Sequence, residues 1–181
     1  RGGDFFYSDN EFEVMKKDVL LCKNLGFTGV VLGVLKENGT VDIPRTSTLV
    51  NLAYPLDVTF HRAFDRTIDP MQALESVIAT GCTRILTSGQ MPCAIDGLNI
   101  IQQLVEAAKN RIVIMPGSGI RSNNIQQIAA FTGVEELHSS AKKMLMNDTV
   151  FNNRSMQEKN ENLVVDEVEI AAMKKILQQI T

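Results

Sequence analysis

Residues 111–119 read RIVIMPGSG, and this stretch decides the fold class. A short apolar run without a polar face leads into a proline and a glycine-rich turn, and a helical pattern follows over residues 122–131. An apolar strand of this kind is typical of a parallel sheet that is covered on both faces. The strand, the turn and the helix together indicate one βα unit of an α/β protein.

The same pattern recurs along the chain. Further strands are predicted in the apolar runs at residues 29–33, 57–61, 84–88 and 134–138. The strands begin roughly 22–28 residues apart, as expected for strand–loop–helix units. Residues 147–162 are polar, which predicts an exposed loop. The remaining helices are predicted over residues 10–25, 70–80, 96–108 and 167–180.

Two architectures could hold about five βα units: a doubly wound sheet, or part of a (β/α)₈ barrel, which needs eight strands and typically ~250 residues. Polar residues follow nearly every predicted strand, at 59–62, 87–89, 116–119 and 138–140. The carboxyl ends of all strands converge on one mouth in a barrel, whereas only two or three meet in an open sheet. We therefore predict an α/β fold of the TIM-type (β/α) barrel, with the five or so C-terminal units in this chain.

The composition excludes several classes of protein. The 181 residues are 44% hydrophobic with a net charge of −3, which argues against disorder and against a polybasic nucleic-acid binder. No apolar run approaches the ~18–20 residues of a membrane span. Three isolated cysteines fit a reducing compartment. We expect one domain over residues 1–181, located in the cytoplasm, with no nucleic-acid or membrane partner.

The last two predicted βα loops suggest an anion site. Gly117-Ser118-Gly119 follows one strand and His138-Ser139 follows the next. Glycines let backbone N–H groups approach an anion, and the last two loops of a barrel frequently build a phosphate site. A tight turn that needs glycine and serine for its own geometry remains the alternative. The candidate anion-binding residues are Arg1, Asp4, Thr87, Ser88, Gly117, Ser118, Gly119 and Ser139.

Both histidines lie at predicted strand ends, and one begins the cluster His61-Arg62 with Asp65 three residues on. A histidine titrates near neutral pH, so His61 is a candidate general acid/base, with His138 as a second candidate. The planar fork of Arg62 suits a carboxylate or a phosphate, and Asp65 completes the candidate catalytic set. The alternative is that Arg62 and Asp65 pair with each other to stabilise the loop.

Soft sulfur ligands are the donors that suit Cu(I). Cys93 and Met91 are close in a loop after a predicted strand, which makes them the candidate metal ligands. The alternative for the methionines is that they fill gaps in the core. Arg1 and Asp4 form a charged pair in an apparent loop that could face the mouth, or a solvated terminus.

Four motifs in this order closely resemble the CutC copper homeostasis family: RGGDFFYS at residues 1–8, VTFHRAFD at 58–65, LTSG at 86–89 and IMPGSGI at 114–120. The resemblance implies a TIM-type barrel, a homo-oligomer in the cytoplasm and also in the nucleus, and copper handling with Cu(I) as the bound ion. The mouth residues that the family shares would correspond to Arg1, Asp4, His61, Arg62, Asp65, Thr87, Ser88 and His138.

Members of that family carry about three βα units before the RGGD loop, so we expect a domain that is incomplete at its N-terminus. The cysteines suspected of holding copper in the family lie in those units. Two functions therefore stay open besides an inactive fragment. One is copper homeostasis through Cu(I) binding. The other is an enzyme that acts on a small phosphorylated or carboxylated metabolite by histidine acid/base chemistry at the mouth.

Overall fold

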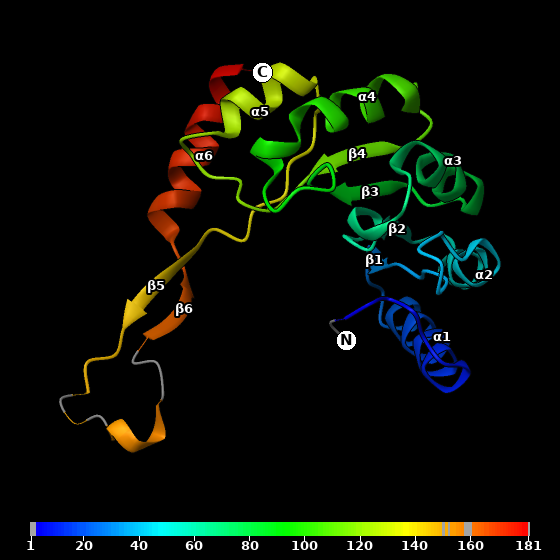
Figure 1. Ribbon diagram of the computed structural model, residues 1–181, viewed down its shortest axis with the longest axis horizontal. Helices are drawn as coiled ribbons and strands as arrows, with labels where there is room; N and C mark the ends of the chain where they lie inside the picture. Colours follow the sequence, from blue (N-terminus) through cyan, green and yellow to red (C-terminus); the bar gives the residue numbers. More distant parts are fainter. Residues whose placement is uncertain (1–2, 150, 152, 158–160, 181) are drawn as a thin grey trace.

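A computed structural model describes residues 3–149, 151, 153–157 and 161–180 of the chain. Four strands form one parallel sheet in the order β1-β2-β3-β4 (Figure 1). A doubly wound sheet reverses its strand order at a switch point, and this sheet does not. The prediction of TIM-type barrel units is confirmed. The strands are β1 (Gly29–Leu32), β2 (Asp57–Phe60), β3 (Arg84–Thr87) and β4 (Val113–Pro116).

Helices connect the strands, and successive helices along the chain pack against one another. Helix α3 shows how the sequence sets the boundaries: Asp69 Oδ1 accepts hydrogen bonds from the backbone of Met71 and Gln72, Pro70 stands in the first turn, and Gly81 ends the helix at φ 83°. The predicted helices are confirmed within a few residues. The helices are α1 (Asp9–Asn24), α2 (Ile43–Ala53), α3 (Pro70–Thr80), α4 (Leu98–Ala108), α5 (Ile125–Thr132) and α6 (Glu167–Ile180).

The core lies between the sheet and its helices. Phe60 and Ile85 are fully buried there, with Leu74 of α3 and Leu104 of α4. Side chains on the other face of the sheet are less covered, since Val31 is 64% exposed. The prediction that both faces of the strands are covered is therefore wrong for β1. The physical reason is that four strands curve without closing into a ring.

The predicted strand at residues 134–138 is wrong over most of its length. Only one parallel bridge forms there, between Gly117 and His138. An ion pair holds this segment to the sheet instead. Arg84 on β3 donates from Nε and Nη2 to the two carboxylate oxygens of Glu136. This contact raises the pKa of Arg84 and lowers the pKa of Glu136.

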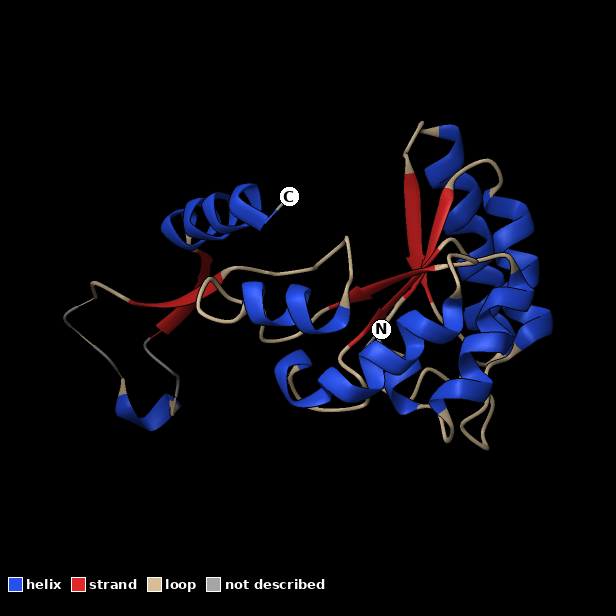
Figure 2. Ribbon diagram, turned by 90° about the horizontal axis from the view of Figure 1, so that it is seen from above, coloured by secondary structure: helices blue, strands red, loops and turns tan. Residues whose placement is uncertain are grey.

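A two-stranded antiparallel ribbon follows the barrel units. It consists of β5 (Lys142–Met146) and β6 (Glu161–Val165). The predicted loop over residues 147–162 is therefore wrong at its end, where β6 begins, and the ribbon was not predicted. Both views show it extending away from the parallel sheet (Figures 1 and 2). None of the helices among the described residues has the length and hydrophobicity of a membrane span.

Candidate functional site

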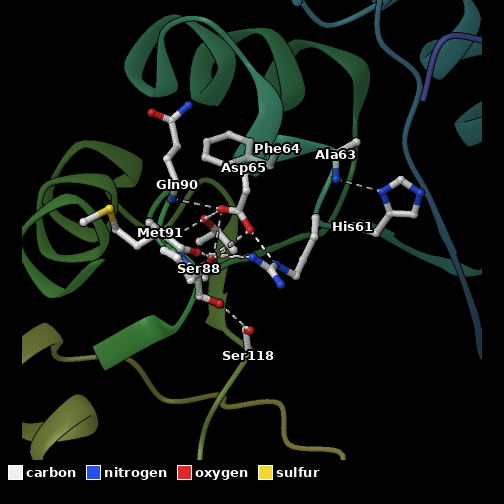
Figure 3. A network of polar contacts seen from close by, with 12 residues as sticks. His61, Ala63, Phe64, Asp65, Ser88, Gln90, Met91 and Ser118 are labelled. Carbon is white, nitrogen blue, oxygen red and sulfur yellow. Dashed lines mark hydrogen bonds and ion pairs between the residues drawn. The ribbon is translucent and has the colours of Figure 1, made fainter. Parts of the chain in front are cut away.

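The loops at the carboxyl ends of β2 and β3 meet around one buried carboxylate (Figure 3). Asp65 lies in a short 3₁₀ turn, Phe64–Arg66, and its side chain is 7% exposed. Its Oδ1 accepts hydrogen bonds from Thr87 Oγ1 at 2.5 Å, from Ser88 N at 3.0 Å and from Gln90 N at 3.1 Å. The carboxylate thus fastens the β3 loop to the β2 loop.

The second oxygen of this carboxylate holds Arg62. Arg62 Nε donates to Asp65 Oδ2 at 2.7 Å, and Arg62 Nη2 donates to Ser88 Oγ at 2.7 Å and to Met91 O at 3.3 Å. The pairing of Arg62 with Asp65, which the sequence left as an alternative, is confirmed. The ion pair leaves Arg62 accessible to a ligand, because 40% of the arginine side chain stays exposed. A guanidinium that is fixed in advance loses less freedom when a ligand binds.

Arg62 also lines a pocket of about 230 Å³ between the ends of β2, β3 and β4. Among the described residues, the wall includes a second arginine, Arg121, and no acidic residue. Arg121 is held as well, since its backbone N–H donates to Asn124 Oδ1 at 2.8 Å and its Nη2 donates to Lys142 O. Two fixed cations beside one small cavity favour an anionic ligand. The lining residues are Arg62, Leu86, Ser118, Gly119, Ile120, Arg121, His138, Ser139 and Ser140.

The predicted glycine loop forms one wall of this pocket. Ser118 and Gly119 both have positive φ, at 81° and 71°. The hydroxyls of Ser118 and Ser139 donate to carbonyl oxygens of the protein, at 2.8 and 2.7 Å, so they fix the loops. Within the described residues, the backbone N–H groups of Gly119 and Ile120 have no protein acceptor. These amides are available to an anion.

Four predicted anion-binding residues lie outside the pocket wall. The hydroxyl of Thr87 and the backbone N–H of Ser88 donate to Asp65. These two residues therefore act on Arg62 indirectly, by fixing the carboxylate that holds it. Gly117 packs so closely against Leu86 that an added Cβ would lie 2.5 Å from Leu86 Cδ1. Asp4 accepts a hydrogen bond from the backbone of Phe6 at 3.0 Å. Arg1 is outside the described residues.

The two histidines have different surroundings. His138 lines the pocket, whereas the ring of His61 is directed away from the Arg62–Asp65 network (Figure 3). His61 Nδ1 accepts a hydrogen bond from Ala63 N at 3.1 Å, and the ring lies 4.6 Å from that of Phe5. Burial lowers the pKa of His61 from its usual value. Because Nδ1 accepts this hydrogen bond, the neutral ring carries its proton on Nε2.

The two candidate sulfur ligands sit beside the pocket and do not line it. Met91 is 44% exposed, and its carbonyl oxygen accepts from Arg62. Cys93 is half-buried against the glycine loop, since a Cβ added to Gly119 would lie 2.9 Å from Cys93 Sγ. Among the described residues, no three His, Cys, Asp or Glu side chains come together as a metal site. Burial raises the pKa of Cys82 to about 11, so that thiol is protonated at neutral pH.

Sequence reasoning missed Arg121, Ser140 and the role of Gln90. Arg121 stands two residues after Gly119, so its position next to the glycine loop was enough to predict that it lies near the anion site. Gln90 could not be found in this way, because its backbone N–H binds Asp65 and its side chain donates to Thr67 O at 2.6 Å. Backbone contacts of this kind leave no mark in the side-chain pattern.

Comparison with known proteins places these features in a family. Residues 1–143 match the model of the CutC family. The chain is 49% identical over 156 residues to a mouse protein and 47% identical over 156 residues to a human protein, both named copper homeostasis protein cutC homolog. It is also 47% identical over 156 residues to a CutC family protein of Parabacteroides distasonis. These alignments cover 86% of this chain, 57% of each mammalian relative and 64% of the bacterial one.

A solved structure agrees with the fold. The crystal structure of a CutC protein from Streptococcus agalactiae superposes with a TM-score of 0.73 at 37% identity, over 76% of this chain and 68% of that chain. The chain therefore spans less than two thirds of the length of the three relatives above. The matched residues include the whole Arg62–Arg121 pocket, whose lining ends at Ser140.

Proposed function

This chain belongs to the CutC family, and we propose that it takes part in copper homeostasis and binds a small oxyanion in the Arg62–Arg121 pocket. The observation that carries the anion site is the wall of the pocket, where two arginines with fixed side chains line a cavity of about 230 Å³ and the described lining contains no acidic residue. A phosphate or carboxylate would meet both cations and the amides of Gly119 and Ile120. The names of the relatives support the copper role.

Inorganic phosphate tests the anion site by calorimetric titration. We expect Arg121→Met to weaken phosphate binding at least tenfold, since one charge-assisted contact contributes about 1.5–3 kcal/mol. Arg111→Met is the matched control, because Arg111 pairs with Glu75 on the protein surface and not at the pocket. Equal phosphate affinities of Arg121→Met and Arg111→Met would contradict the proposal, as would the absence of binding to the unaltered chain.

The enzyme alternative now rests on a different histidine. A proton transfer to or from a ligand in the pocket would fall to His138, because His138 lines the pocket and His61 does not. His61 instead positions the β2 loop through Ala63. An acid/base reaction on a small phosphorylated or carboxylated metabolite remains the second candidate function, and the shared chemistry of the two candidates is the bound oxyanion.

For Cu(I), we propose Cys93 as the first ligand and Met91 as the second. Cys93 is half-buried at the mouth, and sulfur donors suit a soft monovalent ion. In an anaerobic competition titration against a chromophoric chelator, Cys93→Ser should weaken Cu(I) binding at least tenfold. Cys22→Ser is the control, because Cys22 lies on α1, outside the mouth. If both variants bind Cu(I) as the unaltered chain does, Cys93 is not a ligand.

A further inference from the structure

The ribbon of β5 and β6 exposes an apolar face that no described part of the chain covers. All five residues of β5 are exposed. The strand register places Met144 opposite Leu163 and Lys142 opposite Val165, so these side chains share one face. On this face Met144 is 51% exposed, Met146 65%, Leu163 62% and Val165 58%. We call these four residues the ribbon patch.

An isolated two-stranded ribbon is at best marginally stable in water, and it needs a further layer or further strands. The opposite face has one exposed large apolar side chain, Leu145, beside polar groups that are already bonded. Lys143 pairs with Asp166 at 3.2 Å, and Asn162 donates to Asn147 Oδ1 at 2.6 Å. The ribbon patch is therefore the face that gains most from a partner. Most of the ribbon also lies beyond residue 143, where the family match ends.

The charges on this face indicate which partner fits. Lys142 stands at one end of the patch, beside Val165, and Glu161 stands at the other end, beside Met146. The two ends lie four residue steps apart along the strand, which is roughly 13 Å at about 3.3 Å per step. This distance keeps the two charges of one chain apart. When an identical ribbon is turned through a twofold axis that crosses both strands obliquely and is laid on the patch, each Lys142 meets the other chain's Glu161.

We propose that the ribbon patch binds the ribbon patch of a second copy of this chain, in a symmetric dimer. In a twofold contact both copies use the same surface, so it must be complementary to itself. The ribbon patch meets this condition because one end carries Lys142 and the other end carries Glu161. The apolar side chains between these ends are buried in the contact. Because four side chains per copy make a small interface, below the ~800 Å² per partner of stable complexes, we expect a weak dimer that depends on protein concentration.

Sedimentation velocity over a range of protein concentrations tests this dimer through a charge swap. Lys142→Glu places two carboxylates at each end of the contact and should weaken dimerisation at least tenfold, and Glu161→Lys should do the same. The double variant restores both ion pairs with reversed sign and should dimerise like the unaltered chain. Leu145→Glu, on the opposite face, is the control and should leave dimerisation unchanged.

Each outcome decides the question. Loss in the single variants with recovery in the double variant supports the twofold contact. A chain that is monomeric at every concentration overturns the proposal, and the patch would then belong to a different partner. A dimer that Lys142→Glu does not weaken, or that the double variant does not restore, also overturns it. Far-ultraviolet circular dichroism of every variant verifies that the fold is retained.

Discussion

Replacing Asp65 with asparagine is expected to lower the free energy of unfolding by about 3 kcal/mol. The carboxylate is almost fully buried and accepts from Arg62, Thr87, Ser88 and Gln90. An asparagine keeps one acceptor oxygen and turns the other position into an N–H₂ donor. That donor would face Arg62 Nε or the N–H groups of the β3 loop, so at least one buried donor loses its partner.

Urea unfolding measures this loss, with Glu106→Gln as the matched control. The control makes the same chemical change on the exposed surface of α4, where substitutions shift stability by about 0.5 kcal/mol or less. We also expect Asp65→Asn to weaken phosphate binding, because the Arg62 guanidinium loses the contact that orients it. Unfolding of Asp65→Asn and Glu106→Gln at the same urea concentration would show that the carboxylate does not join the two loops.

The role of Asp65 also shows what the sequence could predict about the site. The rule that parallel strands converge at their carboxyl ends was sufficient to predict that Arg62, Ser118, Gly119, His138 and Ser139 lie together. This rule could not predict that Arg62 lines the pocket and His61 does not, because adjacent side chains after a strand can point in opposite directions. The close packing of His61 on Phe5 and on Gly33 decides its direction, and no spacing rule contains that contact.

The fold was predictable where local and tertiary preferences agree. The strands β1 to β4 and the capped helix α3 follow directly from apolar runs, Pro70 and Gly81. Helix α2 was missed because its Thr and Ser residues have weak helix propensity, although Asp42 accepts from Arg45 N as an N-cap should. The ribbon was missed because residues 147–160 separate β5 from β6 and give no short-turn signal.

Replacing Gly97 with alanine is expected to have an effect as large as that of Asp65→Asn, about 3 kcal/mol of unfolding free energy. Gly97 ends the 3₁₀ helix η2 (Ala94–Gly97), which lies directly against the β3 loop. An added Cβ would lie 2.0 Å from Ser88 O and 2.9 Å from Gly89 Cα. Both contacts are with backbone, so no side-chain rotation can relieve them, and the loop that carries Ser88 must move.

Gly26→Ala separates this steric cost from the ordinary cost of losing a glycine. Gly26 has φ 75° and no atom within 4 Å of an added Cβ, so its substitution should cost only the left-handed strain of about 1–2 kcal/mol. Gly97 has φ −101°, which alanine adopts freely. Urea unfolding should therefore find Gly97→Ala less stable than Gly26→Ala, although only Gly26 needs the left-handed conformation.

The loop displacement should also weaken phosphate binding in Gly97→Ala, because Ser88 positions both Asp65 and Arg62. The reverse order of stabilities would show that η2 and the β3 loop are not in close contact, and that the Arg62–Arg121 pocket is not held from this side.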